Sequence, residues 1–267
     1  MSKRNQEYWS NKDYRAKVAY RHIEYMENNF QEEIIDSVNR SIQFTGNVNN
    51  FSKRPSDFLR YEAKIIIDNI DTVSAIFKYK QGRTAALNFA SYKNPGGMFI
   101  KGSSAQEECL CHSSTLYNVL FRFNDFYYWN RDHLNNALYL NRAIWSPDIL
   151  FLSSNNSKHE FCDIITCAAP NKYAAQKYKN ISEEINSNIL FDRINFVLDI
   201  ANSMYTETLI LGAYGCGVFG QDPRQVANIF KLYLKNINCS FERVIFAIPE
   251  SPNNKNLKEF KKVFGIY

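Results

Sequence analysis

The stretch NFASYKNPGGMFIKGSSAQEECLCHSSTLY, residues 88–117, decides how this chain is organised. Its NPGG segment at 94–97 is a turn sequence, because proline presets φ and glycine supplies positive φ and lets a ligand approach the backbone. Gln106, Glu107 and Glu108 follow in a row. Adjacent carboxylates behind a glycine turn are costly in a core but useful in a cleft that binds a sugar. We therefore expect the rest of the chain to hold such a cleft together.

The composition is that of a large globular protein. The chain has 267 residues, of which 45% are hydrophobic and 15% aromatic, so it is predicted to form one domain, or one domain with an extension. A disordered chain would carry far fewer aromatic residues. The net charge of +5 is mild and most simply serves solubility. Without a basic patch interleaved with aromatics, nucleic acid is not predicted as the primary partner.

Nothing in the sequence predicts secretion or membrane insertion. The first residues, MSKRNQEYWSNKDY, lack the apolar segment of a secretory signal, and the longest apolar runs, such as VIFAI at 244–248, are strand-sized. Cysteines are scattered along a large chain, which predicts reduced thiols and a cytoplasmic location. They stand at 109, 111, 162, 167, 216 and 239.

The N-terminal part reads differently from the rest. Residues 11–40 show apolar positions at helical spacing among charges, with Gly46 marking their end, and 46–60 are polar and loop-like. We predict an N-terminal helical extension over 1–60 and a main catalytic domain over 61–267.

Strands and helices alternate through the main domain. Apolar or β-branched runs predict strands at 64–68, 84–90, 148–153, 161–168, 207–214 and 243–248, with a weaker alternation at 74–79. Helices are predicted at 104–123 with Ser103 or Ser104 as N-cap, at 182–203, after Asp222-Pro223, and at 253–264. The aromatic-rich segment 124–147 is predicted to be an insertion. This alternation predicts a three-layer α/β domain.

A glycine loop, residues 215–220, lies between a predicted strand and a predicted helix. Free backbone N–H groups and the helix dipole would both favour a phosphate there. The loop satisfies the pattern G-x-G-x-x-G, but it lies in the last third of the chain and no acid follows at the distance a dinucleotide fold needs. A tight turn that uses glycine only for close packing is the alternative. Phe219 could cover a ribose or base, or belong to the core.

The acidic pair admits two interpretations. Adjacent helical residues point about 100° apart, so Glu107 and Glu108 are not expected to bury together in one core face. One of the two, as a carboxylic acid, could protonate a glycosidic oxygen while the other binds neighbouring hydroxyls. The alternative is a solvated first turn with acids that the helix dipole favours. Cys109, Cys111 and His112 lack the second half of a metal site, and a Cys–His nucleophile at Cys109 or Cys216 has no support from the scattered histidines.

Three segments together resemble the microbial-type poly(ADP-ribose) glycohydrolases, a branch of the macrodomain fold. They are NPGG at 94–97, QEE at 106–108 and GAYGCGVFG at 212–220. The family signature is three glycines followed, after a short spacer, by Gln-Glu-Glu; TCAAPN at 166–171 also fits. Met98 stands in place of the third glycine, where a side chain would disfavour φ > 0 and narrow the pocket.

The resemblance implies an α/β fold with a three-layer α/β/α macrodomain-like mixed sheet. It implies a glycosidase that hydrolyses ribose–ribose O-glycosidic bonds in poly(ADP-ribose) and releases ADP-ribose, with no cofactor and no metal. Glu108 would be the catalytic acid and Glu107 would hold ribose hydroxyls.

The resemblance also implies the binding residues. Those around the reacting ribose would be Asn88, Asn94, Gly96, Gly97 and Gln106. Those that cradle the diphosphate would be Gly215, Cys216, Gly217, Val218 and Phe219. The adenine end would lie near 68–72.

The expected partners are ADP-ribose or poly(ADP-ribose) chains, including chains on modified proteins, and nucleic acid only where it carries ADP-ribose. The protein is expected to be a monomer. Because Met98 replaces a family glycine, two alternative functions stay open. The protein could bind ADP-ribose without hydrolysis, or it could hydrolyse mono-ADP-ribose from protein or nucleic acid. A Rossmann-type dehydrogenase is a third alternative.

Overall fold

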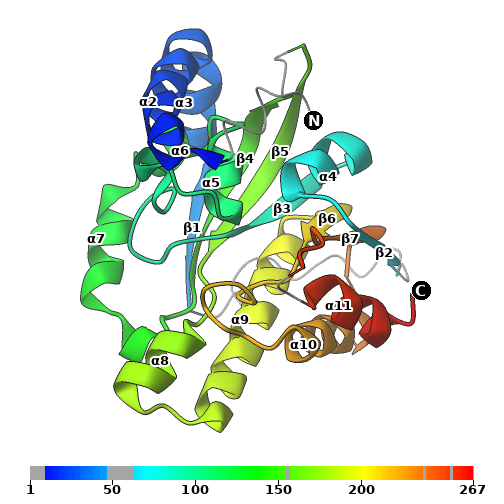
Figure 1. Cartoon of the computed structure of the whole chain (residues 1–267). Coiled ribbons are helices and arrows are strands. Elements are labelled where there is room, and N and C mark those ends of the chain that lie inside the picture. Colours follow the sequence, from blue (N-terminus) through cyan, green and yellow to red (C-terminus); the bar gives the residue numbers. More distant parts are fainter. Residues whose placement is uncertain (1–9, 47–62, 154–156, 237–238, 253–254, 267) are drawn as a thin grey trace.

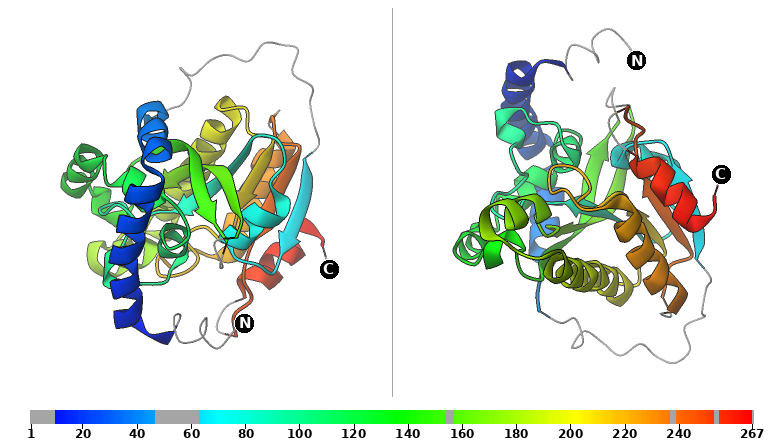
Figure 2. Two further views of the ribbon diagram at one scale, coloured as in Figure 1. Left: turned by 90° about the horizontal axis from the view of Figure 1, so that it is seen from above. Right: turned by 60° about the horizontal axis from the view of Figure 1, so that its bottom comes forward.

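The computed structural model describes residues 10–46, 63–153, 157–236, 239–252 and 255–266. A seven-stranded mixed sheet runs through the molecule in the order β1-β4-β5-β3-β6-β7-β2, with helices on both faces (Figures 1 and 2). The predicted three-layer α/β/α architecture with a mixed sheet is confirmed. The polar loop predicted at 46–60 lies outside the described residues, apart from Gly46.

The strands share one direction over most of the sheet. Their bounds are β1 (Ile42–Thr45), β2 (Lys64–Asp68), β3 (Thr84–Phe89), β4 (Arg142–Leu152), β5 (His159–Cys167), β6 (Thr208–Leu211) and β7 (Arg243–Ala247). β3 pairs in parallel with β5 and β6, and β7 pairs in parallel with β6 and β2, whereas β4 runs antiparallel to both β1 and β5. Six of the seven strands therefore end at one edge of the sheet, and β4 alone runs the other way.

Helices cover the two faces because successive strand residues point to opposite sides. Leu87, Leu209 and Phe246 enter a core with α9 (Glu183–Ser203), α10 (Pro223–Asn236) and α11 (Asn256–Phe264). Ala86, Ile210 and Ile245 enter a second core on the other face. Helices on that face include α2 (Lys12–Asn29), α3 (Gln31–Arg40), α4 (Thr72–Tyr79), α5 (Gln106–Cys111), α6 (Leu116–Leu120) and α7 (Asn124–Asp132). Burial on both faces explains why these strands read as continuous apolar runs.

The N-terminal helices predicted at 11–40 are present as α2 and α3. They are followed by β1, a strand that the sequence reading did not predict, and β1 pairs with β4 at the edge of the sheet. The division at residue 60 stays a prediction, although this edge strand joins the N-terminal part to the same sheet. Within the described part of the chain, none of the helices combines the length and the hydropathy that a membrane-spanning helix needs.

Three predictions about the face of the sheet that carries α2 are wrong. The weak alternation at 74–79 belongs to helix α4, because the Asp71 side chain caps it by accepting the Ser74 N–H at 2.9 Å. The single helix predicted at 104–123 is two helices, α5 and α6, separated where Ser114 forms an isolated bridge with Phe151. The predicted Ser103 or Ser104 cap is replaced by Ala105, which makes no side-chain cap.

The segment predicted as an insertion at 124–147 instead forms regular structure. It contains α7, the short helical turn η2 (Asn135–Ala137) and the first half of β4. A further helix, α8 (Lys172–Lys179), follows β5 and was not predicted.

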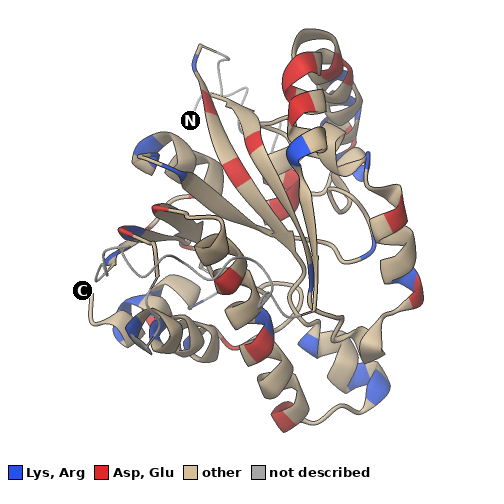
Figure 3. Cartoon of the chain, turned by 180° about the vertical axis from the view of Figure 1, so that it is seen from behind, with Lys and Arg blue, Asp and Glu red and all other residues tan. Residues whose placement is uncertain are grey.

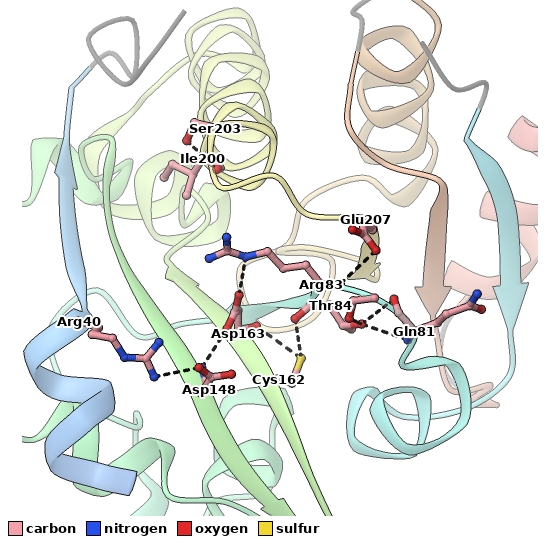
Figure 4. Close-up of polar contacts among 11 residues, drawn as sticks. Arg40, Gln81, Arg83, Thr84, Asp148, Cys162, Asp163, Ile200, Ser203 and Glu207 are labelled. Carbon is pink, nitrogen blue, oxygen red and sulfur yellow. Dashed lines mark hydrogen bonds and ion pairs between the residues drawn. The ribbon is translucent and has the colours of Figure 1, made fainter. Parts of the chain in front are cut away.

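Toward the amino-terminal ends of β3 and β5, a buried carboxylate holds a bulge in β4 (Figure 4). Asp148 has φ of +49°, and its N–H donates to Asp163 Oδ1 at 2.9 Å. Arg83 donates to the other oxygen of Asp163 at 3.3 Å. Burial raises the pKa of Asp163. These contacts are structural and lie away from the strand ends that carry the candidate site.

Candidate active site

The two segments singled out from the sequence converge at one edge of the sheet. β3 leads into the NPGG turn and β6 leads into the glycine loop, and these two strands are neighbours. The ring of Phe89, at the end of β3, lies 5.6 Å from the ring of Tyr214, the residue just before the glycine loop. In parallel α/β sheets, ligands bind outside the carboxyl ends of the strands, so this is the expected place for a site.

The NPGG turn closes directly onto the acidic pair. Gly97 N–H donates to Asn94 O at 3.1 Å, and Gly96 and Gly97 have φ of +63° and +62°. A Cβ on Gly97 would lie 2.5 Å from Glu108 Oε1 and 2.9 Å from Glu107 Oε2. Glycine is therefore needed at 97 both for its backbone conformation and for the space that the carboxylates occupy.

Glu107 is buried and bonded to the end of β3. It is 3% exposed, accepts the Ser91 N–H at 2.6 Å and accepts a bond from Asn88 Nδ2 at 3.2 Å. Burial raises the pKa of Glu107 to about 8. A proton therefore stays on this buried group at neutral pH.

Glu108 is buried beside it but is held by a different segment. It is 6% exposed, and its Oε1 accepts the Met98 N–H at 2.8 Å. Among the described residues, no group hydrogen-bonds its buried Oε2. Both glutamates are buried, which excludes a solvated first turn, but they do not share one apolar core face, because each carboxylate bonds the main chain of a different segment.

Gln106 fixes the start of α5 to β3. Its Oε1 accepts the Phe89 N–H at 2.8 Å, and its Nε2 donates to Leu87 O at 2.8 Å and to Thr72 Oγ1 at 3.1 Å. With both ends of its amide bonded to protein groups, Gln106 positions the two glutamates that follow it.

Asn88 hydrogen-bonds Glu107 of the acidic pair directly, whereas Asn94 lies in the NPGG turn. Asn88 is fully buried, and its Nδ2 also contacts Thr166 Oγ1 at 3.3 Å. Its Oδ1 has no partner among the described residues. The Asn94 side chain accepts a long bond of 3.5 Å from Arg131 on α7. Asn88 is thus the better placed of the two to bond a buried ligand.

Met98 causes no backbone strain. Its φ is −111°, which any residue adopts, and its side chain is 40% exposed. The expectation that methionine would conflict with a positive φ at this position is therefore wrong for this chain.

The glycine loop presents main-chain donors to solvent. The N–H groups of Gly217, Val218 and Phe219 make no hydrogen bond to any described group, and Val218 is 84% exposed. Gly215 has φ of +73°, and a Cβ there would lie 2.9 Å from both the Ala169 Cβ and the Gln221 Cγ. Close packing therefore explains Gly215, while Gly217, Val218 and Phe219 keep the donors that an anion needs.

A row of aromatic side chains, called here the aromatic wall, connects the segment after β3 with the glycine loop. Tyr92, just after β3, stacks on Tyr139 at 4.4 Å, and Tyr139 lies 6.1 Å from Phe219 in the glycine loop. Sequence reasoning missed Tyr92 and Tyr139. The aromatic content of 124–147 was the available signal, but the pairing joins segments distant in sequence.

The thiols near the site are not activated. Burial raises the pKa of Cys109 to about 12 and also raises the pKa of Cys216. A thiolate nucleophile needs the opposite shift. Within the described residues, no group of three His, Cys, Asp or Glu side chains could hold a metal ion.

The fold and its strand-end site define a macrodomain-like α/β protein, and comparison with known proteins identifies the family. The family model described as "Microbial-type PARG, catalytic domain", where PARG is poly(ADP-ribose) glycohydrolase, matches residues 15–154. The chain belongs to this family. A search of curated proteins found no match.

Solved structures of bacterial enzymes are similar to this protein over most of its length. The poly(ADP-ribose) glycohydrolase of Thermomonospora curvata is 25% identical, with a TM-score of 0.83 over 94% of this chain and 99% of that one. The same enzyme bound to the inhibitor ADP-HPD gives a TM-score of 0.79 at 25% identity, over 93% of this chain and 98% of that one. The Deinococcus radiodurans enzyme in complex with ADP-ribose is 30% identical, with a TM-score of 0.77 over 87% of this chain and 97% of that one.

Proposed function

We propose that this protein is a poly(ADP-ribose) glycohydrolase that cuts ribose–ribose O-glycosidic bonds and releases ADP-ribose. The observation that carries the proposal is the buried Glu108, whose Oε1 is fixed by the Met98 N–H while Oε2 bonds no described group. Family membership and the solved relatives that hold ADP-ribose or ADP-HPD support the choice of substrate.

In the proposed reaction, the Glu108 carboxyl protonates the leaving ribose oxygen as the bond to the anomeric carbon breaks. The oxocarbenium-like carbon is then attacked by water, whose proton returns to the Glu108 carboxylate. Glu107, which burial keeps protonated at neutral pH, donates a hydrogen bond to ribose hydroxyls. Asn88 Oδ1, buried beside Glu107, accepts one.

The diphosphate would lie on the glycine loop. The N–H groups of Gly217, Val218 and Phe219 supply donors, and Gly215 and Cys216 shape the turn that presents them. Phe219, half-buried against Tyr139, would contact the ribose next to the phosphates. The adenine end would extend toward the end of β2, at 68–72. Monomeric state and cytoplasmic location stay predictions.

The test is release of ADP-ribose from labelled polymer by wild type and by Glu108→Gln. Loss of the acid should lower kcat by on the order of 100-fold or more, with thermal unfolding and ADP-ribose affinity retained. No release by wild type, or unchanged release by the variant, would reject the proposal. Tight ADP-ribose binding without turnover would favour a non-hydrolysing module. A parallel assay on a mono-ADP-ribosylated peptide distinguishes the remaining alternative.

A further inference from the structure

Helix α8 carries exposed aromatic rings and lysines and no acidic residue. Its sequence is KYAAQKYK, with Tyr173 53% exposed and Tyr178 64% exposed. Its lysines appear in blue in Figure 3. The helix buries Ala175 and leaves four of its eight side chains exposed, so packing against the core does not account for its aromatic residues and lysines.

Lys177 lies between the two exposed rings. Its Nζ donates to Tyr173 Oη at 2.8 Å and lies 5.1 Å from the Tyr173 ring centroid and 5.3 Å from that of Tyr178. Lys172, in contrast, pairs with Glu183 at 2.8 Å. Among the described residues, Lys177 has no carboxylate within ion-pair distance, so its charge remains available to an anion.

The helix adjoins the glycine loop. The Tyr173 N–H donates to Phe219 O at 3.0 Å, and Gly220 faces the Tyr173 Cβ. Because α8 follows β5, it lies on the β4–β5 side of the site, away from β2 (Figure 1). A polymer whose terminal adenine points toward β2 would leave the site on the α8 side.

We propose that α8 binds the unit of poly(ADP-ribose) that follows the one held in the site, an inference that rests on the proposed function. Each unit carries one adenine and a diphosphate, which match the Tyr173 and Tyr178 rings and the Lys177 ammonium between them. Aromatic stacking on bases combined with cationic groups is the general mode of binding single-stranded nucleotide polymers. Direct continuity with the glycine loop favours this polymer over RNA or DNA.

The test compares wild type with the double variant Lys177→Gln/Tyr178→Ala, which leaves the Tyr173 contact with the loop intact. KM for poly(ADP-ribose) should rise roughly fivefold or more, with kcat and the Kd for ADP-ribose unchanged. The matched control is Lys235→Gln/Leu232→Ala on α10, which also removes one exposed charge and exposed apolar surface and should keep the wild-type KM.

An unchanged KM for the polymer, or an equal loss of affinity for ADP-ribose, would overturn the inference. Fluorescence anisotropy with labelled poly(ADP-ribose) and with single-stranded RNA provides a second readout that does not need turnover. Weaker binding of the polymer alone supports the inference, even if wild type releases no ADP-ribose and the proposed function fails. An equal loss of affinity for single-stranded RNA would overturn the inference and show that α8 binds nucleic acid in general.

Discussion

The Met98 N–H donates to Glu108 Oε1 at 2.8 Å, so the turn after β3 fixes the proposed acid through its main chain. This contact needs no particular side chain at 98, and the φ of −111° suits any residue. The replacement of the third family glycine by methionine therefore leaves the hold on the acid intact.

We expect Met98→Gly to change kcat for ADP-ribose release by less than about threefold, because neither the main-chain donor nor the backbone conformation depends on the side chain. Met98→Ala should behave in the same way. Steady-state kinetics on polymer of defined length would measure both variants. A gain of tenfold or more in Met98→Gly would instead mean that the methionine side chain obstructs the substrate.

Gly97→Ala should both destabilise the protein and inactivate it. Its Cβ would meet Glu108 Oε1 at 2.5 Å and Glu107 Oε2 at 2.9 Å, in addition to the cost of positive φ. We expect at least a 100-fold loss of kcat and a loss of about 2 kcal/mol or more in the free energy of unfolding.

Gly265→Ala is the matched control for that variant. Gly265 also has positive φ, +72°, but a Cβ there would meet nothing within 4 Å. It should lose about 1 kcal/mol of stability and keep full activity. Similar activity losses in the two variants would show that the contact with the carboxylates is not what makes Gly97 necessary.

Glu107 should make stability fall as pH rises. Its pKa is 4.5 in the reference state and about 8 when folded, so the folded state binds more protons between these values. The free energy of unfolding should therefore decrease by up to about 1.4 kcal/mol per pH unit from pH 5 toward 8.

Glu107→Gln should remove this slope, because glutamine does not ionise. Urea unfolding at pH 5.5 and 7.5 would measure the pH dependence of the free energy of unfolding. The stability of the variant relative to wild type should be greater at pH 7.5 than at pH 5.5. Glu32→Gln, at an exposed position in α3, should keep the wild-type pH dependence. Parallel pH curves for wild type and Glu107→Gln would contradict the proton assigned to this buried group.

Local sequence signals predicted the parts of the fold that local chemistry determines. The run TAALNFA is mostly apolar because β3 is covered on both faces. Asp222-Pro223 starts α10, with the Asp222 side chain accepting the Gln225 N–H at 2.8 Å. The segment 74–79 was too short to distinguish a helical from a strand period. The segment is helical because the Asp71 side chain caps its first turn, and a short apolar run does not reveal such a cap.

The site was predicted as a set of residues but not as a geometry. The Glu107–Ser91 and Glu108–Met98 bonds join residues 16 and 10 positions apart, and only the folded chain closes them. Tyr139 reaches Tyr92 from a segment where Asn135, Asn136, Ala137 and Tyr139 itself all have positive φ. Such conformations are unfavourable for non-glycine residues, so tertiary contacts must impose them.

One of those contacts comes from Arg193 on α9, which is 1% exposed. Its Nε donates to Asn141 Oδ1 at 2.6 Å, and its guanidinium also donates to the carbonyls of Ala168 and Leu138. Within the described residues, no carboxylate pairs with it. Arg193 thus ties the segment before β4 to the end of β5, beside the aromatic wall.

Arg193→Met should therefore cost roughly 3 kcal/mol or more in the free energy of unfolding, because it leaves several buried acceptors without a donor while nearly preserving volume. Arg193→Lys should lose less, since an ammonium can still bond one or two of them. Arg224→Met, at an exposed position of α10, should change stability by less than about 0.5 kcal/mol. Denaturant unfolding would measure all three, and equal stabilities for Arg193→Met and Arg224→Met would show that the positive-φ segment does not depend on Arg193.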